Sequence, residues 1–430
     1  MEVERRDRRT DRGDGGKVMS HHLVREKEDN GIVDFELSEE QKAVRNMVRD
    51  FTEKEILPYI QEWDAKGHFE MSIIEKLADL GLMGVCIPEQ YGGAGMDYNT
   101  LAIVCEELEY GDTAFRTAVS VHTGLNSMTL LQWGNEEQKA RYLVPQAKGE
   151  KIGAFGLTEP DAGSDVAGMK STAVRDGDEY VLNGTKTWIS LADHADHFLI
   201  FAYTDTEKKH HGISAFIVER TFPGVTTRPI KGKLGIRAGN TGEVMMEDVR
   251  VPKENLLGEE GEGFKIAMSA LDNGRFTVAA GAAGLTRACL DASVKYANER
   301  KTFGKEIGRY QLVQQMIANM VAGYETSQLL VYRAGWLKNR GKRNTRETSL
   351  AKWYACDVAF RSACDAVQVH GAYGYSSEYP VERFMRNAKA PVIYEGTREV
   401  HTIMQGEYAL GYRRDKPLRQ MLPSWPFDRS

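Results

Sequence analysis

Cysteine is scarce in this chain of 430 residues: there are five, they lie far apart, and no two form a CxxC pair. The pattern excludes a disulfide framework and a cysteine-based zinc site, and it favours reduced thiols in a cytoplasm. The sequence also lacks an apolar run long enough to span a bilayer, and its net charge of −6 comes without a basic stripe. We therefore expect a cytoplasmic protein that binds neither membrane nor nucleic acid.

Two further absences narrow the possible cofactors. A G-x-G-x-x-G motif between a strand and a helix is missing, which argues against a Rossmann-type nicotinamide site. His194 and His197 have a spacing that could hold a metal, but no cysteine accompanies them. We interpret both as surface histidines and expect no metal site.

Composition and periodicity divide the chain into four parts. Residues 1–34 mix arginines with acids and contain few apolar side chains, which predicts a disordered tail, and their acids argue against a mitochondrial transit peptide. From residue 35 apolar side chains recur with helical spacing, as at Val44, Met47, Val48 and Phe51. The same spacing recurs at 73–82, 98–109 and 121–133. Residues 35–150 are predicted to form an N-terminal helical domain.

The period changes after residue 150. Asn183-Gly184 lies between two short apolar runs, 180–182 and 185–189, which predicts a β-hairpin with a two-residue loop. Further short runs predict a small central β domain over 151–260, a barrel or a sandwich. Long helical patterns return over 261–430 and predict a C-terminal four-helix bundle. The expected fold class is α+β, with helices, strands and helices in that order.

One loop, Phe155 to Asp165 (FGLTEPDAGSD), combines hydroxyls, a proline, a glycine and free backbone amides. Such a loop can hold a flat polar ring or a phosphate, although the composition is also that of an ordinary turn. Three further motifs accompany it: GTKTWIS at 184–190, RKTFG at 300–304 and YEGT at 394–397. Together, in this order and at these separations, they resemble the acyl-CoA dehydrogenases, and the resemblance spans about 35–412.

The resemblance implies the acyl-CoA dehydrogenase fold and FAD as cofactor. Removing hydrogen from two adjacent carbons beside a thioester needs a hydride acceptor, which no side chain provides. Ser190 and Leu191 stand where the family usually has Thr and Asn, and Ala372 where many members have glycine. The implied contacts to the flavin ring are Phe155, Leu157, Thr158, Gly163, Ser164, Trp188 and Ser190, with Thr397 and Glu399 nearby. Those to its pyrophosphate and adenine, from a neighbouring subunit, are Arg300, Phe303, Gln311, Gln368 and Gly371. A homo-oligomer, typically a tetramer, follows.

Glu395 is the implied catalytic base. A lone glutamate in a C-terminal loop is usually a solvated acid, but within Tyr394-Glu395-Gly396-Thr397 the resemblance places it opposite the flavin. Burial there should raise its pKa toward neutrality, as a base working near pH 7 requires. Some branches carry the base at the position of Gly274, which cannot serve. The implied substrate contacts are Arg116, Ser120, Glu109, Ser164, Phe264, Asp272, Arg275, Tyr394 and Gly396.

Arg116 bears on the acyl chain, because it lies in an apolar run and a buried charge needs a partner. Glu109, two helical turns earlier, is one candidate, and a substrate carboxylate is another, which arginine's planar fork suits. The segment is similar to that of glutaryl-CoA dehydrogenases. This implies oxidation of glutaryl-CoA to glutaconyl-CoA, with electron-transferring flavoprotein as the electron acceptor. Two outcomes stay open after oxidation: release of glutaconyl-CoA, or loss of carbon dioxide to give crotonyl-CoA.

Three alternatives stay open. A short-chain, butyryl-type dehydrogenase would keep Arg116 as a structural partner of Glu109. An acyl-CoA oxidase would share every motif and differ in oxygen access. A non-catalytic CoA- or flavin-binding protein would be expected to have lost the base, which is present.

Overall fold

Residues 36–427 are described by the structure, a computed structural model. The chain divides into two units, Met1–Ser38 and Glu39–Ser430, and the second carries every element discussed below. The predicted disordered tail, 1–34, lies outside the described residues.

The N-terminal part of the second unit is helical, as predicted. Its first helix buries Val48 and Phe51, the end of the apolar face that the sequence indicates. Helix α4 is buried on almost every side, because it lies between α1 and the C-terminal helices. The helices are α1 (Glu39–Phe51), α2 (Ile60–Lys66), α3 (Met71–Asp79), α4 (Tyr98–Gly111), α5 (Thr113–Val119), α6 (Met128–Trp133), α7 (Glu136–Gln138) and α8 (Val144–Ala147).

A π-helical segment, Ser120–Ser127, joins α5 to α6. The sequence predicts one ordinary helix over 121–133, but here the chain widens into i to i+5 turns before α6 begins. All eight residues of the segment are buried. Wide turns of this kind are rare and often accompany functional sites.

The central part forms one mixed sheet of eight strands in the order β6-β7-β3-β2-β4-β5-β8, with β1 paired in parallel to β4. Strands β4 and β5 are continuous apolar runs and are almost wholly buried, as expected of central strands. The strands are β1 (Gly153–Gly156), β2 (Thr172–Asp176), β3 (Glu179–Ser190), β4 (His197–Tyr203), β5 (Ile213–Glu219), β6 (Val225–Pro229), β7 (Thr241–Pro252) and β8 (Leu256–Leu257).

The predicted hairpin at Asn183-Gly184 is wrong. Strand β3 runs straight through this pair, and its hairpin partner is β2, with the turn at Gly177. Asn183-Gly184 forms a bulge against β7, where Asn183 exchanges two hydrogen bonds with Asp248. Gly184 has φ +147°, and a Cβ there would lie 2.6 Å from that of Ser171. The glycine therefore serves a β-bulge and a close approach rather than a turn.

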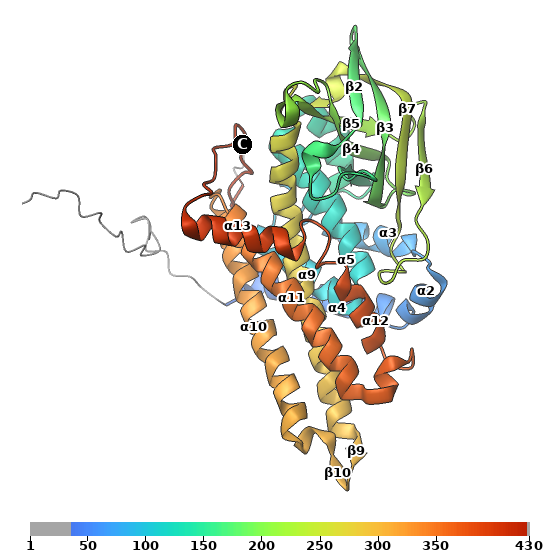
Figure 1. The fold of residues 1–430 in the computed structure, drawn as a ribbon, viewed down its shortest axis with the longest axis vertical. Helices are drawn as coiled ribbons and strands as arrows, with labels where there is room; N and C mark the ends of the chain where they lie inside the picture. Colours follow the sequence, from blue (N-terminus) through green and yellow to red (C-terminus); the bar gives the residue numbers. More distant parts are fainter. Residues whose placement is uncertain (1–35, 428–430) are drawn as a thin grey trace, which may run out of the picture. The chain divides into compact units, whose positions relative to one another are not determined.

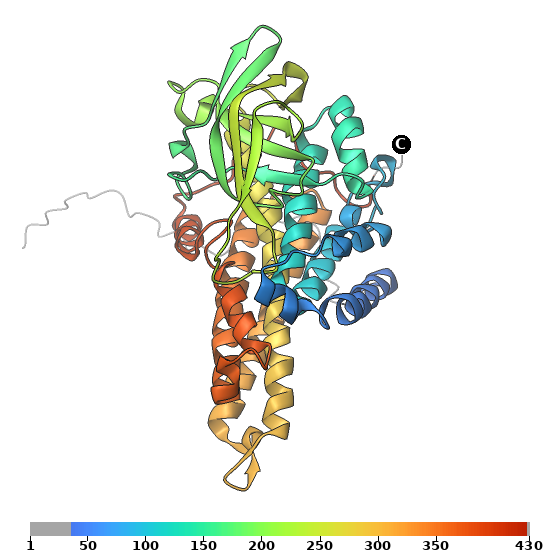
Figure 2. The same cartoon turned by 90° about the vertical axis from the view of Figure 1, so that its right-hand side faces the viewer.

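Three long helices, α9, α10 and α11, lie side by side in the C-terminal part (Figures 1 and 2). Helix α9 packs against α4, α10, α11 and β5, so it joins the helical parts to the sheet. The two-stranded β9–β10 hairpin lies at the far tip of these helices. The elements are α9 (Gly263–Glu299), β9 (Lys301–Thr302), β10 (Lys305–Glu306), α10 (Gln311–Asn339), α11 (Thr345–His370), α12 (Val381–Lys389) and α13 (Arg398–Leu410).

After α13 the chain runs back over the N-terminal helices. Arg419 forms an ion pair with Glu262 at the start of α9, at 2.5 Å. The Tyr98 hydroxyl donates to the Pro423 carbonyl at 2.8 Å, and the Trp425 amide donates to Asn339 at 2.7 Å. The segment thus ties the starts of α4 and α9 to the end of α10.

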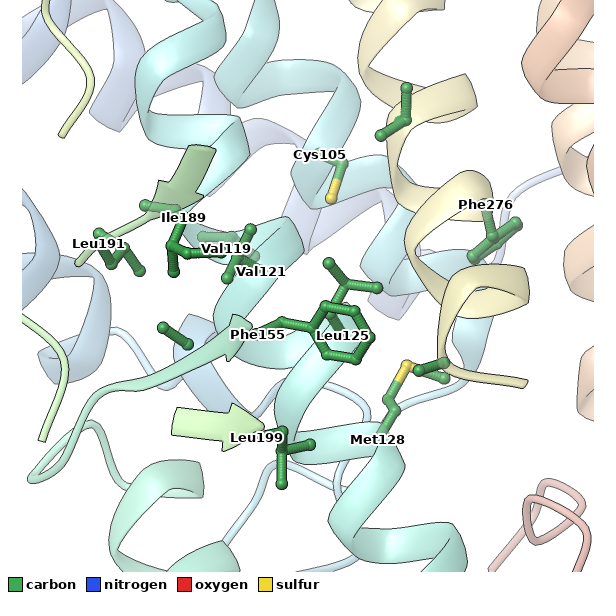
Figure 3. Close-up of a cluster of buried hydrophobic side chains, with 14 of the residues drawn as sticks. Cys105, Val119, Val121, Leu125, Met128, Phe155, Ile189, Leu191, Leu199 and Phe276 are labelled. Atoms are coloured by element: carbon green, nitrogen blue, oxygen red, sulfur yellow. The ribbon is translucent and has the colours of Figure 1, made fainter. Parts of the chain in front are cut away.

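The core is continuous between the helical and β parts. Figure 3 shows side chains gathered from the segment around Leu125, from the strands at Phe155 and Leu199, and from α9 at Phe276. Within 36–427, no helix has both the length and the apolar composition needed to cross a membrane.

Candidate active site

Glu395 lies in a strained turn between α12 and α13. Its backbone has φ +55°, a conformation that costs a residue with a side chain about 1 kcal/mol or more, and Gly396 follows at +97°. The buried Oε2 atom of Glu395 has no hydrogen-bond partner in the described part of the chain. Burial raises the pKa of this carboxyl to about 7, against the lowering effect of Arg116, Lys352 and Arg275. Such a carboxyl can take and return a proton near neutral pH.

Arg116 is buried beside Glu395, with 1% of its surface exposed. Its Nε donates to Glu109, and its Nη2 donates to the Tyr394 hydroxyl at 2.5 Å. The expected Glu109 partner is therefore present, but the two residues do not share a helix: α4 ends at Gly111 and α5 carries Arg116. Asp112 caps α5 between them and pairs with Arg383 at 3.1 Å.

Two glycines of α9 leave room for these charged side chains. A Cβ on Gly274 would overlap Glu395 Oε2 and would lie 2.6 Å from Leu125. A Cβ on Gly281 would overlap the Glu109 carboxylate and lie 2.7 Å from Arg116 Nε. The side of α9 that faces the site thus lacks a side chain at two positions, two turns apart, and the charged groups occupy that space. The sequence identified Gly274 only as unable to act as a base.

Three residues contact the peptide carbonyls of Glu395 and Gly396, and a fourth holds one of the three. Arg275 donates from Nε to the Glu395 carbonyl at 3.1 Å, and His401 Nε2 lies 3.3 Å from the same oxygen. Lys352 donates to the Gly396 carbonyl at 2.7 Å, and Ser349 Oγ lies 2.9 Å from His401 Nδ1. The sequence pointed to Arg275. The sequence analysis missed Ser349 and Lys352. The available signal was a lysine that lies among small and apolar residues in a long helical pattern.

The other predicted substrate contacts spread along α9 and the π-helical segment. Ser120 is buried, and its hydroxyl lies 2.5 Å from that of Thr277 on α9. Asp272 accepts hydrogen bonds from Arg275 at 3.3 Å and from Thr345 at 2.5 Å. Phe264, in the first turn of α9, lies against His210, about three turns from Arg275. These residues trace a path along α9 to Glu395.

Most of the residues predicted to contact a flavin ring lie on β1, on the loop that follows it and at the end of β3. Phe155 lies in β1, and Leu157 comes directly after that strand. The Thr187 amide donates to the Thr158 carbonyl at 2.9 Å, which joins the loop after β1 to the last part of β3. Trp188 has 60% of its surface exposed and a backbone φ of +60°. A large exposed indole beside the hydroxyls of Thr158 and Ser190 fits a flat, partly polar ring. Gly163 and Ser164 lie on the exposed part of the loop, and Thr397 caps α13 just before the exposed Glu399.

A buried ion pair, which the sequence did not predict, holds this loop. Lys186 donates to Glu159 at 2.7 Å and to the Leu157 carbonyl at 3.2 Å, and the Glu159 carboxylate accepts from the amides of Lys170 and Ser171. Burial lowers the pKa of Lys186 to about 8, and Glu159 opposes that shift. The pair fixes both ends of the loop to β3.

Lys186→Met is expected to lower the free energy of unfolding by about 3–5 kcal/mol, because it leaves the Glu159 carboxylate buried without its cation. Urea titration at pH 7 measures the change. Lys170→Met is the control, because its ion pair with Asp161 is exposed and should contribute little. Equal effects of the two substitutions would show that the buried pair does not hold the loop.

The residues predicted to contact the far end of the cofactor lie elsewhere. Arg300, Phe303, Gln311, Gln368 and Gly371 cluster around the β9–β10 tip and the ends of α9, α10 and α11, far from β3 (Figure 1). All five are exposed, and Phe303 is 97% exposed. One chain therefore does not bring the two sets together, as expected if a neighbouring subunit supplies the second set.

Backbone strain marks three of the predicted residues. Among the described residues, seven other than glycine have a positive φ, and Trp188, Phe303 and Glu395 are three of them. Strain of this kind is retained where the surrounding structure holds it and is often found at functional sites.

Within residues 36–427, no group of three or more His, Cys, Asp or Glu side chains gathers as a metal site would require. His197 is not a surface histidine as predicted: it is 3% exposed, and its Nε2 lies 2.8 Å from Gln146 Nε2. Burial lowers its pKa to about 3, so it is neutral.

Three family models match the chain in sequence. The N-terminal domain of acyl-CoA dehydrogenases matches residues 38–150, the middle domain 154–249 and the C-terminal domain 261–409. The chain is 45% identical over 372 residues to a short-chain-specific acyl-CoA dehydrogenase of Clostridium acetobutylicum, covering 86% of this chain and 98% of the relative. It is 42% identical over 387 residues to a glutaryl-CoA dehydrogenase of Desulfococcus multivorans, covering 89% and 99%.

Solved structures agree with these matches. A chain solved in work on the electron-transferring flavoprotein of Acidaminococcus fermentans superposes with a TM-score of 0.87 at 44% identity, covering 89% of this chain and all of that one. An acyl-CoA dehydrogenase of Bacillus anthracis in complex with FAD superposes with a TM-score of 0.82 at 34% identity, covering 87% of this chain and 68% of that one.

Proposed function

This chain belongs to the acyl-CoA dehydrogenase family, and from that premise we propose that its substrate is glutaryl-CoA, a short acyl-CoA with a carboxylate at its far end. Members of the family are FAD-dependent oxidoreductases acting on CoA thioesters. The activity class is set by the family, whereas the acyl chain is argued from the site. The single observation that carries it is Arg116, a fully buried cation beside Glu395.

Glu395 is the proposed base for the α proton. Bound FAD would supply the hydride acceptor for the β carbon. The carboxylate is buried, its Oε2 is free of other partners among the described residues, and its pKa near 7 leaves a large fraction ionised at neutral pH. The Glu395 amide, held by the strained turn, is proposed to donate to the thioester oxygen, which makes the α proton more acidic.

Arg116 is proposed to bind the distal carboxylate. Nε and Nη2 are used by Glu109 and Tyr394, which leaves Nη1 as a donor toward a substrate. Glu109 and Tyr394 hold the guanidinium in place, so it loses little freedom on binding. A carboxylate held there would put the α and β carbons of a five-carbon chain between Arg116 and Glu395.

Decarboxylation is the second half of the proposal. After oxidation, the carboxylate is attached to the carbon next to the new double bond, and loss of carbon dioxide leaves a dienolate. Protonated Glu395 would return its proton to that carbanion and give crotonyl-CoA. An enzyme that oxidises glutaryl-CoA but does not break the bond to carbon dioxide would release glutaconyl-CoA.

A short-chain, butyryl-type substrate is the second candidate. The observation that favours it is the buried ion pair itself, because Glu109 already neutralises Arg116. In that case Arg116 only fixes Tyr394 beside the base.

Three features support proposals about the oligomer, the electron acceptor and the cellular compartment of this protein. Exposed contacts at the β9–β10 tip support a homo-oligomer, a tetramer in our proposal, in which one subunit completes the cofactor site of another. One structure that superposes on this chain comes from work on an electron-transferring flavoprotein, which supports such a protein as the electron acceptor. The five unpaired cysteines fit a cytoplasmic enzyme.

Anaerobic turnover of glutaryl-CoA and butyryl-CoA, with an artificial electron acceptor and mass analysis of the products, tests the proposal. Crotonyl-CoA from glutaryl-CoA, with butyryl-CoA much slower, is the expected result. Glutaconyl-CoA would keep the substrate and remove the decarboxylation. A preference for butyryl-CoA would leave the second candidate.

The double variant Glu109→Gln with Arg116→Met is expected to lower kcat/KM for glutaryl-CoA by about 30-fold or more, because a buried charged hydrogen bond to substrate is lost. The pair is removed together so that no lone charge stays buried. For butyryl-CoA kcat/KM should fall much less. Glu109→Gln alone leaves the cation buried without its carboxylate, so thermal unfolding must show that this variant folds; if it does, it should turn over glutaryl-CoA better than the double variant does. Equal losses with both substrates would make Arg116 structural.

A further inference from the structure

Lys352 occupies an unusual place for a lysine. It lies on α11 with 1% of its surface exposed, and its ammonium donates to the Gly396 carbonyl at 2.7 Å. That carbonyl follows directly after Glu395, within the strained turn. A hydrogen bond from a buried cation is stronger than one between neutral groups, so it can offset the cost of a positive-φ residue.

The neighbouring contacts restrain the turn from the other side. Arg275 on α9 and His401 on α13 both meet the Glu395 carbonyl, and Ser349, one turn before Lys352 on α11, holds the His401 ring. Burial lowers the pKa of His401 to about 2, so the ring is neutral. Arg275 and Lys352 are therefore the two cations that hold the backbone of this turn.

These cations differ in how their charge is balanced. Arg116 is paired with Glu109, and Arg275 lies 3.3 Å from the Asp272 carboxylate. For Lys352, no carboxylate in the described part of the chain lies within ion-pair distance, so its charge acts on Glu395 with less opposition. The titratable and charged groups that act on Glu395 are Cys105 on α4, Arg116 on α5, Arg275 on α9 and Lys352 on α11, and His401 on α13 meets its carbonyl. Glu109 on α4 and Tyr394 in the same loop act on Arg116, and Cys356 on α11 acts on Lys352.

We propose that Lys352 is a positioning residue for Glu395: its ammonium fixes the peptide that follows the base and favours the ionised carboxylate. The inference rests on the proposed function, because it takes Glu395 as the base. Arg275 also holds this turn and favours the ionised carboxylate, but the Asp272 carboxylate lies beside its charge, whereas Lys352 has no such partner among the described residues.

The direction of the electrostatic effect is fixed by sign. Burial raises the pKa of Glu395, and the cations Arg116, Lys352 and Arg275 lower it. Removing the Lys352 charge therefore raises that pKa further, and less of the base is ionised at pH 7. Burial also lowers the pKa of Lys352 itself, against the effect of Cys356 and Glu395. A substitution that keeps the charge should leave the carboxylate near its present pKa.

The test follows proton abstraction without hydride transfer. A butyryl-CoA analogue with sulfur in place of the β carbon can lose its α proton to the base but cannot give up a hydride. We would incubate it with the FAD-loaded enzyme in deuterated buffer and follow α-proton exchange by mass spectrometry from pH 5 to 10. In Lys352→Met, the pH midpoint of exchange is expected to rise by about one unit, with exchange at pH 7 about fivefold slower. The difference should shrink above pH 9, and Lys352→Arg should restore the midpoint.

Lys338→Met is the matched control. Lys338 is also a buried lysine in a long helix, but its ammonium donates to Asn273 and does not face Glu395. Its removal should leave the exchange midpoint in place. Thermal unfolding of each variant checks that it folds, and if Lys352→Met fails to fold, Lys352→Gln, which can still donate to Gly396, carries the same expected rise.

The outcomes separate the two claims. If the wild-type enzyme exchanges the α proton and Glu395→Gln exchanges it equally well, Glu395 is not the base and the proposed function falls. If exchange needs Glu395 but the midpoint stays unchanged when Lys352 loses its charge, the inference alone is overturned. A slower exchange at every pH with no change in midpoint would likewise reduce Lys352 to a structural residue.

Discussion

Glu395→Gln is expected to lower turnover by about 10²- to 10⁴-fold, the usual contribution of a positioned general base. Glutamine has nearly the same shape, so the strained turn and its contacts to Lys352 and Arg275 should persist. It cannot accept the α proton. Steady-state turnover of the FAD-loaded variant at pH 8 measures the loss, and the flavin absorbance confirms that the cofactor is retained.

The same substitution should stabilise the fold at neutral and higher pH. The pKa of Glu395 is raised from 4.5 to about 7 in the folded protein, so the folded state favours the protonated form. Its contribution to stability is fully present below about pH 4.5 and is lost as pH rises through 7. Glutamine cannot ionise, so at pH 8 the variant should gain up to about 3 kcal/mol in the free energy of unfolding.

Urea titrations of the wild type and the variant at pH 5 and pH 8 measure this gain, because the difference in the free energy of unfolding between the two proteins should be larger at pH 8. Glu75→Gln, on the exposed side of α3, should show no such dependence on pH. An active Glu395→Gln enzyme, or one whose stability advantage is the same at both pH values, would contradict a buried base with a raised pKa.

Gly274→Ala is expected to reduce kcat by about 100-fold through displacement of Glu395, the proposed base. The added methyl would overlap Glu395 Oε2 and press on Leu125 at 2.6 Å, so the carboxylate or the turn must move. A shift of about 1 Å at a reacting group can cost this much in rate, and overpacking a core costs about 1–3 kcal/mol. Turnover and thermal unfolding of the variant measure the two effects.

Gly406→Ala is the control for the helix itself. Gly406 lies in α13 with open space where the methyl would stand, so alanine should stabilise the helix slightly and leave kcat unchanged. If Gly274→Ala has the wild-type kcat, Glu395 does not need the space that the missing side chain at position 274 leaves.

The sequence predicted the architecture well where a pattern is local. Helical periodicity gave α1 and α4, and the change of period near residue 150 gave the β part, because burial of one face or of alternate residues leaves a trace along the chain. It failed at Asn183-Gly184. The pair is typical of a hairpin turn, but pairing with β7 and the close approach of Ser171 favour a bulge, and neither contact is visible from nearby residues.

The site shows the same division. Glu395, Arg116 and Glu109 stand in recognisable motifs, and the structure brings them together. The pairing of Arg116 with Glu109 was expected along one helix, whereas it forms across the junction of α4 and α5. Lys352, Ser349 and the Lys186–Glu159 pair were missed because each acts on a segment distant in the sequence. A lone buried lysine has no spacing rule that reveals its partner.

The overlap between a Cβ on Gly274 and the Glu395 carboxylate bears on the evolution of the site as well as on its packing. Two places in the chain, a turn of α9 and the loop before α13, reach the same point in space. A lineage could therefore move its acidic side chain from one place to the other with paired substitutions and leave the surrounding side chains as they are. Gene duplication followed by such an exchange would change which residue does the chemistry while the chemistry itself is inherited.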